Sequence, residues 1–139
     1  MPATDRPRVL ADFAGRWSLE REITPAVGPS ASFRGQAVWS PDGDALRYVE
    51  EGQLQIEGHA AMQATRSYLW LPDLTVQFDD GRFFHQVPAM GGETGHWCDP
   101  DQYAVHYDFS RWPRFEVSWQ VHGPRKDYRM LSRYAREQR

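Results

Sequence analysis

The sequence predicts an all-β fold: a single antiparallel up-and-down β-barrel of about eight to ten short strands, preceded by one helical turn. Short runs that alternate apolar and polar residues are cut by Gly, Pro and Asp along almost the whole chain. Helical periodicity is confined to a turn at residues 8–14. Meanders of short strands tend to close on themselves, because closure removes the exposed edges of the sheet.

The pattern contains no repeat and no linker, so we expect one domain over residues 1–139, with flexible ends at 1–7 and 137–139. A chain of 139 residues is long enough to bury one sizeable core. We expect strands near residues 15–24, 32–40, 45–51, 53–57, 60–71, 74–79, 82–88, 96–98, 103–109, 114–122 and 127–135.

The composition argues against several classes of protein. A net charge of −3 gives no basic face for nucleic acid. No apolar run approaches the ~20 residues that cross a bilayer, and the N-terminus has no apolar signal region. The lone Cys98 cannot form an intrachain disulfide. We therefore expect a cytoplasmic monomer or homodimer that binds neither nucleic acid nor a membrane.

Hairpin turns fix which residues face each other, and such residues share one face of the sheet. A two-residue turn at residues 80–81 pairs Val76 with His85. An eight-residue loop over 88–95 then sets His85 opposite Cys98. The register therefore places His85 on the inner face, beside the strands that follow it.

Three hairpins near the C-terminus share strands and agree on one inner face. Their loops fall at residues 99–102, 110–114 and 123–126, and the first of them pairs Cys98 with Tyr103. The shared inner face collects His96, Cys98, Tyr103, Val105, Tyr107, Val117, Trp119, Val121, Tyr128 and Met130.

The segment Gly15-Arg16-Trp17 opens the first strand and resembles the start of the calycin superfamily, the lipocalins and their relatives. The resemblance implies that Trp17 closes one end of the barrel and that a basic side chain of the last strand packs across its ring. Arg136 lies an even number of residues from Tyr128 and Met130, so its side chain should point to the inner face, as this contact requires. Gly15 would allow a close approach of the N-terminal segment.

The chain also resembles, over nearly its full length, a family of small bacterial and fungal proteins that carry a domain of unknown function. The resemblance implies a lipocalin-like barrel and no particular activity. The segments that carry it are FAGRWSLERE, YVEEGQL, YLWLP, VQFDDGRFFHQ and HWCDPDQYAVHYDFSRWPRFEVSWQVHGPRKDY.

His85, His96 and Cys98 form the first candidate site. Two imidazoles and a thiol on adjacent strands are able to bind zinc, to ligate haem iron or to form a Cys–His nucleophile pair. The alternative is structural: each His is a buried residue bonded to a Tyr hydroxyl, a carboxylate or water, and Cys98 packs as a small apolar residue. No cofactor is strongly implied.

The second candidate site consists of Arg21, Arg66 and Glu50. Each of them is expected on the same face of its strand as apolar neighbours. A turn at residues 42–43 pairs Trp39 with Leu46 and puts Glu50 on the apolar face. A buried Arg needs a partner. That partner is either an internal carboxylate such as Glu50 or the carboxylate of a bound ligand, as in the fatty-acid-binding relatives of the lipocalins.

These residues support three hypotheses about function. The first is a carrier or sensor for a small, largely apolar ligand, with His85, His96 and Arg21 as polar anchors in a cavity lined by Tyr103, Tyr107, Trp119, Tyr128 and Met130. The second is an isomerase, cyclase or hydratase that uses His85 or His96 as general base. The third is an interaction module with a filled core, in which Trp97 and Trp112 contact a partner.

Overall fold

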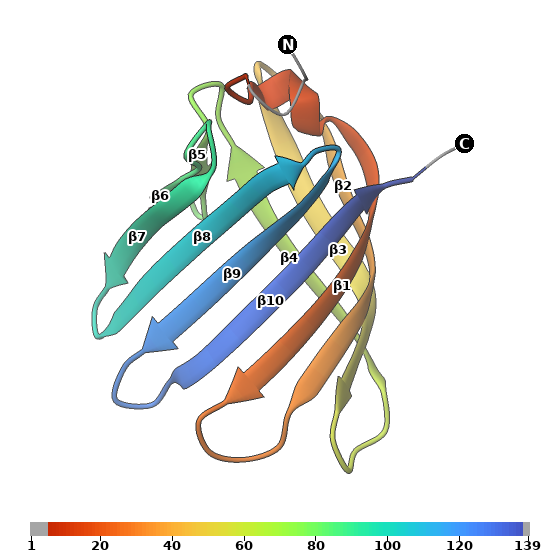
Figure 1. The fold of residues 1–139 in the computed structure, drawn as a ribbon, viewed down its shortest axis with the longest axis vertical. Coiled ribbons are helices and arrows are strands. Elements are labelled where there is room, and N and C mark those ends of the chain that lie inside the picture. Colours follow the sequence, from red (N-terminus) through yellow and green to blue (C-terminus); the bar gives the residue numbers. More distant parts are fainter. Residues whose placement is uncertain (1–5, 138–139) are drawn as a thin grey trace.

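The computed structural model describes residues 6–137, whose strands form one ten-stranded antiparallel sheet (Figure 1). The order in space is β6-β5-β4-β3-β2-β1-β10-β9-β8-β7, so β1 and β10 join the two halves of the meander. The elements are a 3-10 turn η2 (Leu10–Phe13), β1 (Gly15–Pro25), β2 (Ala31–Asp42), β3 (Ala45–Ile56), β4 (Met62–Trp70), β5 (Thr75–Gln77), β6 (Phe83–Gln86), β7 (Gly92–Cys98), β8 (Asp101–Arg111), β9 (Arg114–His122) and β10 (Asp127–Arg136).

The sheet curves into a nearly closed, lipocalin-like barrel, which confirms the predicted fold class. Its two end strands, β6 and β7, meet at a seam that no backbone ladder joins in the described part of the chain. Side chains bridge the seam instead: the ring of His96 lies 5.5 Å from that of Phe83 and 5.9 Å from that of Phe84. The barrel wall is therefore weakest between β6 and β7.

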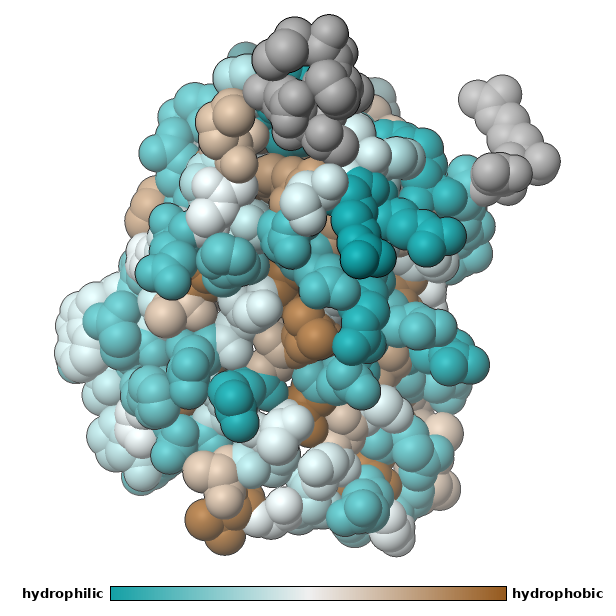
Figure 2. Space-filling view, in the orientation of Figure 1, coloured by the Kyte–Doolittle hydropathy of each residue, from teal (hydrophilic) through white to brown (hydrophobic). Residues whose placement is uncertain are grey.

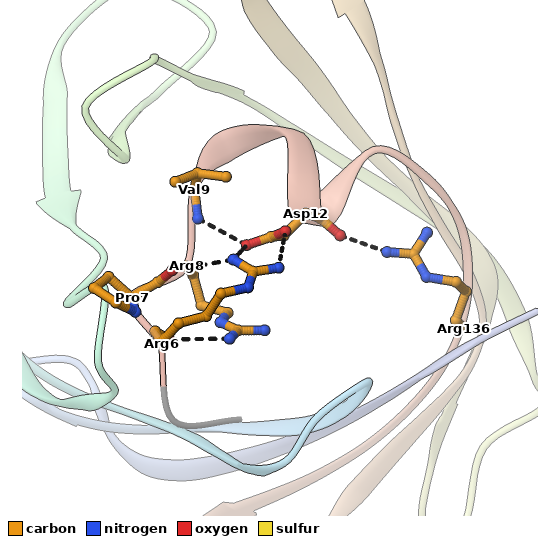
Figure 3. A network of polar contacts seen from close by, with 6 residues as sticks. All are labelled: Arg6, Pro7, Arg8, Val9, Asp12 and Arg136. Carbon is orange, nitrogen blue, oxygen red and sulfur yellow. Dashed lines mark hydrogen bonds and ion pairs between the residues drawn. The ribbon is translucent and has the colours of Figure 1, made fainter. Parts of the chain in front are cut away.

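The 3-10 turn covers the end of the barrel near which both chain termini lie, here called the closed end (Figures 1 and 3). Trp17 is fully buried, and its indole N–H donates to the carbonyl oxygen of Phe13 at 2.8 Å. The guanidinium carbon of Arg136 lies 4.3 Å from the centre of the Trp17 ring. Arg136 also donates to the carbonyl oxygens of Asp12 and Ala14, so it ties β10 to the turn.

The ends that the sequence predicts to be flexible fall partly outside the described residues, which exclude 1–5 and 138–139. Arg6, from the same predicted N-terminal end, forms an ion pair with Asp12 at 2.8 Å (Figure 3). Glu137 donates its backbone N–H to the carbonyl oxygen of Arg16 at 3.0 Å.

Most hairpin registers agree with the sequence analysis. Val76 pairs with His85, and Tyr107 pairs with Val117. Two turns differ from the prediction. The turn after β2 lies at residues 43–44, so Trp39 pairs with Tyr48 rather than with Leu46.

The turn after β7 contains only residues 99–100, so Cys98 pairs with Asp101 rather than with Tyr103. Both slips are two residues long. Because side chains alternate with a period of two, a two-residue slip leaves every residue on its predicted face.

The predicted loop over residues 88–95 is wrong, because β7 begins at Gly92. Gly91 and Gly92 adopt φ values of 83° and 112°, which only glycine accepts readily, and they reverse the chain within a few residues. The predicted pairing of His85 with Cys98 is wrong, because no backbone ladder joins β6 to β7 among residues 6–137. Across the seam it is His96 that meets β6.

Strand β3 runs unbroken through Gly52, where the sequence analysis places a gap between two strands. Gly52 pairs with Gly35 of β2, and the two backbones approach unusually closely. A Cβ on Gly52 would lie 2.3 Å from the carbonyl oxygen of Arg34 and 2.7 Å from the Cα of Gly35. The two glycines therefore permit the sharp curvature that closes the barrel between β2 and β3.

We expect Gly52→Ala to lower the free energy of unfolding by about 3 kcal/mol, because the methyl group would push two backbones apart. Urea denaturation followed by tryptophan fluorescence measures the loss. Gly95→Ala is the matched control, since its Cβ would lie 3.2 Å from the nearest backbone oxygen and a smaller loss is expected. Equal losses for the two variants would contradict this explanation of the curvature.

Candidate ligand site inside the barrel

A buried ion pair crosses the interior at mid-height. Arg21 of β1 donates from both terminal nitrogens to the carboxylate of Glu50 of β3, at 2.5 and 2.9 Å, and both side chains are buried. The Nε of Arg21 donates to the hydroxyl of Ser132 on β10 at 2.7 Å. Of the two partners that the sequence leaves open for Arg21, the structure shows the internal carboxylate.

Two tyrosines complete the hydrogen bonding of this pair. The hydroxyl of Tyr48 donates to Glu50, and the hydroxyls of Tyr48 and Tyr134 lie 2.8 Å apart. Burial opposes the charge on Glu50, but the hydrogen bond and charge of Arg21 outweigh it and lower the pKa of the carboxyl. Burial raises the pKa of Tyr134 to about 12. At neutral pH the pair is therefore ionised and the phenols are neutral.

Arg66 of β4 adds a third charge that the pair does not neutralise. It lies opposite Glu50 in the sheet register, but its Nε is 3.9 Å from a carboxylate oxygen that already accepts from Arg21. The guanidinium carbon lies 5.7 Å from the centre of the Trp119 ring. The side chain of Arg66 is 41% exposed, whereas those of Arg21 and Glu50 are buried. These three groups therefore carry a net charge of about +1 at neutral pH, and the surplus cation is the accessible one.

Exposure of the inward-facing residues divides the barrel into two halves. On β1, Trp17, Leu19 and Arg21 are buried, whereas Ile23 is half-buried. On β3 the change falls between Glu50 and Leu54. The half farther from the termini, here called the open end, keeps partly exposed inward residues on five strands and directly after β5: Ile23, Leu54, Ala64, Arg66, Tyr68, Phe78, Trp119 and Tyr128.

The hairpin of β5 and β6 explains this asymmetry, because both strands are short. β5 pairs with β4 only at Leu69 and Trp70. The edge of β4 from Met62 to Tyr68 has no ladder partner on that side among the described residues. An unpaired strand edge of β4 therefore flanks Arg66 at the open end in this part of the chain.

His85 lies on the inner face but is shielded from solvent. Its Nε2 lies 2.7 Å from the hydroxyl of Tyr107, and both residues are buried. Burial, with a smaller contribution from His96, lowers the pKa of His85 to about 3. The imidazole is therefore neutral at physiological pH and is a weak base, which argues against the predicted role as general base.

The first candidate site does not assemble as a cluster. Among residues 6–137, no group of three or more His, Cys, Asp or Glu side chains is arranged to hold a metal ion. His85 bonds to Tyr107, His96 packs against Phe83 and Phe84, and Cys98 is half-buried near the end of β7. The separation follows from the early start of β7, which moves Cys98 away from His85.

The interior contains a cavity of about 30 Å³, far smaller than a ligand-sized chamber. Of the predicted site residues, its walls include Arg21, Glu50, Arg66, His85, Tyr107 and Trp119. The remaining predicted residues lie outside these walls: His96, Cys98, Tyr103, Tyr128 and Met130. Aromatic rings fill the predicted space.

Six wall residues with polar groups were not among the predicted site residues: Trp39, Tyr48, Tyr68, Trp70, Ser132 and Tyr134. Strand parity was the available signal for two of them, because Ser132 and Tyr134 follow Met130 at even spacing. No sequence signal indicated that the ring of Trp39 reaches the centre.

A larger hollow of about 900 Å³ lies on the outer surface of the sheet, where Glu22, His106 and Leu131 contribute to its walls. The face of β8, β9 and β10 shown in Figure 2 is mostly hydrophilic. This hollow contains none of the buried charges.

We expect Glu50→Gln to lower the free energy of unfolding by about 3–5 kcal/mol, because it leaves the buried Arg21 without a counter-charge. Chemical denaturation measures the loss, with Glu51→Gln on the outer face as control. The double variant Arg21→Met, Glu50→Leu removes both charges and should be more stable than Glu50→Gln alone. A Glu50→Gln protein as stable as the control would show that the pair is not essential.

We expect the free energy of unfolding to fall as the pH decreases from about 6.5 to about 5. In this pH range His85 binds a proton in the unfolded state but stays neutral in the folded state, because its pKa there is about 3. The contribution is fully present above about pH 6.5 and is lost toward about pH 3, at up to about 1.4 kcal/mol per pH unit. Denaturation at several pH values should give a flatter profile for His85→Gln. An unchanged profile would contradict the burial of a neutral His85.

Comparison with known proteins gives a family and one informative structure. A model for a family of unknown function, DUF6314, matches residues 13–136. None of the curated proteins matches the chain. An S-type phycobiliprotein lyase from Guillardia theta has a similar structure, with a TM-score of 0.68 and 9% identity over 94% of this chain and 91% of the lyase chain.

Identity this low shows a common fold and nothing about the reaction. In the described residues no helix is long and apolar enough to cross a membrane. Because the family model covers nearly all of the described barrel, the chain belongs to the family of unknown function DUF6314.

Proposed function

We propose that this protein binds a small, largely apolar molecule that carries an anionic group, and that the ligand enters at the open end and meets Arg66. The observation that carries the proposal is the partly exposed guanidinium of Arg66 on the inner face, beside an ion pair that is already neutral. An apolar ligand with one anionic group matches both the charge and the surroundings of this side chain.

Electrostatics favours an anion at this position. Both terminal nitrogens of Arg21 are engaged by Glu50, which leaves the positive charge of Arg66 only weakly compensated at 3.9 Å. A carboxylate beside a guanidinium forms charge-assisted hydrogen bonds, often two in parallel. The partly apolar walls reduce solvent screening, so the contact is stronger here than on the open surface.

The open end supplies apolar surface for the body of the ligand. Trp119 and Tyr128 lie on the neighbouring strands β9 and β10, Ile23 lies on β1 next to β10, and Leu54 lies on β3. These side chains are only half-buried, so a ligand would remove apolar area from water at about 25 cal/mol per Å². Aromatic side chains with one polar anchor are typical of small-molecule sites.

The size of the interior cavity decides how deep the ligand goes. A volume of about 30 Å³ has room for a water molecule or a small polar group but not for the body of a ligand. The body of the ligand therefore rests at the open end, and the central ion pair stays in place. The likeness to the phycobiliprotein lyase supports the scaffold alone, because 9% identity transfers no residue.

We expect decanoate to bind more tightly than decan-1-ol, and Arg66→Gln to weaken decanoate binding roughly tenfold or more, the magnitude of a lost charge-assisted hydrogen bond. Isothermal titration calorimetry measures both affinities. Arg82→Gln is the control, because Arg82 is exposed and pairs with Asp80 on the outside. Equal binding of acid and alcohol, or an unchanged affinity in Arg66→Gln, would rule out an anion site at Arg66.

A further inference from the structure

Two residues that line the central cavity each bury a nitrogen atom with no hydrogen-bond partner among residues 6–137. The atoms are Nε1 of Trp39 and Nδ1 of His85, and each residue is 2% exposed. The other polar side chains deep in this wall are satisfied by one another, as Arg21, Glu50 and Ser132 illustrate. An unsatisfied buried polar group is rare in native proteins. Two such groups on one small cavity indicate that a water molecule or a ligand atom binds there.

The chemistry of the two nitrogens defines this occupant. The indole N–H of Trp39 only donates, so the occupant must accept a hydrogen bond. His85 is neutral, and its Nε2 shares one hydrogen bond with the hydroxyl of Tyr107, which has no second partner among the described residues. Its Nδ1 therefore either donates or accepts, depending on the tautomer. A hydroxyl oxygen satisfies Trp39 and either tautomer of His85.

The volume is consistent with one oxygen atom. A cavity of about 30 Å³ holds a single water molecule, and therefore also a single hydroxyl group. Arg66 and Trp119 belong to the same cavity wall and are partly exposed, so the cavity adjoins the open end. A ligand held by Arg66 is thus close enough to place one substituent inside.

We propose that the central cavity is a subsite for one hydroxyl group of the ligand, held by Trp39 and His85, so that the preferred ligand is a hydroxylated carboxylic acid. This inference rests on the proposed function, because it takes Arg66 as the anchor of the carboxylate. In the free protein a water molecule occupies the subsite. The hydroxyl replaces that water when the ligand binds, and a ligand without a hydroxyl leaves the water in place.

The test compares decanoate with 2-hydroxy-, 3-hydroxy- and 10-hydroxydecanoate by isothermal titration calorimetry. At least one hydroxy acid should bind roughly tenfold more tightly than decanoate to the wild-type protein. The ratio of the two dissociation constants should approach one in His85→Phe and in Trp39→Phe. The inference is overturned if no hydroxy acid gains affinity, or if the gain survives both substitutions.

A second measurement uses the wild-type protein alone, in case the core variants do not fold. Nuclear magnetic resonance detects transfer of magnetisation from a long-lived water to the indole N–H of Trp39. The signal should be present in the free protein, persist with decanoate and disappear with the tightest hydroxy acid. A water that persists with every probe would show a structural water only. Decanoate binding that does not depend on Arg66 would instead refute the proposed function, so the two failures are distinguishable.

Discussion

The ion pair between Arg21 and Glu50 is the constraint on which the interior of this barrel depends. Two charges at the centre of a small core are tolerated only if hydrogen bonds satisfy every remaining polar atom. Ser132, Tyr48 and Tyr134 supply those bonds, and their positions fix the spacing of β1, β3 and β10 around the pair. Aromatic rings fill the closed end beyond it. At the open end the pair leaves Arg66 as a surplus cation.

The alternation of apolar and polar side chains predicted the fold well. A register error of two residues leaves each side chain on the same face of the sheet. Two hairpin pairings slipped by two residues, and yet Trp39, Glu50 and Cys98 lie on the faces that the sequence analysis assigned to them. Turn length was the weak point. Gly91 and Gly92 reverse the chain in a tight turn, which composition alone does not distinguish from the start of a long loop.

The candidate site was predictable in kind but not in volume. Parity identified Arg21, Glu50 and Arg66, and the need for a counter-charge identified their chemistry, but only the structure shows which partner Arg21 takes. The small size of the cavity follows from how Phe84 packs against Trp119 and how Trp39 packs against Tyr48, which depends on rotamers that a sequence pattern does not contain. The candidate site therefore lies at the open end beside the hydrogen-bonded ion pair, rather than in a cavity lined by all of the residues that the sequence predicted.

Native mass spectrometry tests the central claim most directly. The protein is incubated with the small-molecule fraction of a cell extract, separated from unbound compounds by gel filtration, and measured before and after denaturation. A complex of one protein with one molecule is predicted, and the compound released by denaturation should be anionic with an apolar body. Release of neutral compounds only, or a protein mass without any addition, would contradict a barrel that selects an anionic ligand at Arg66.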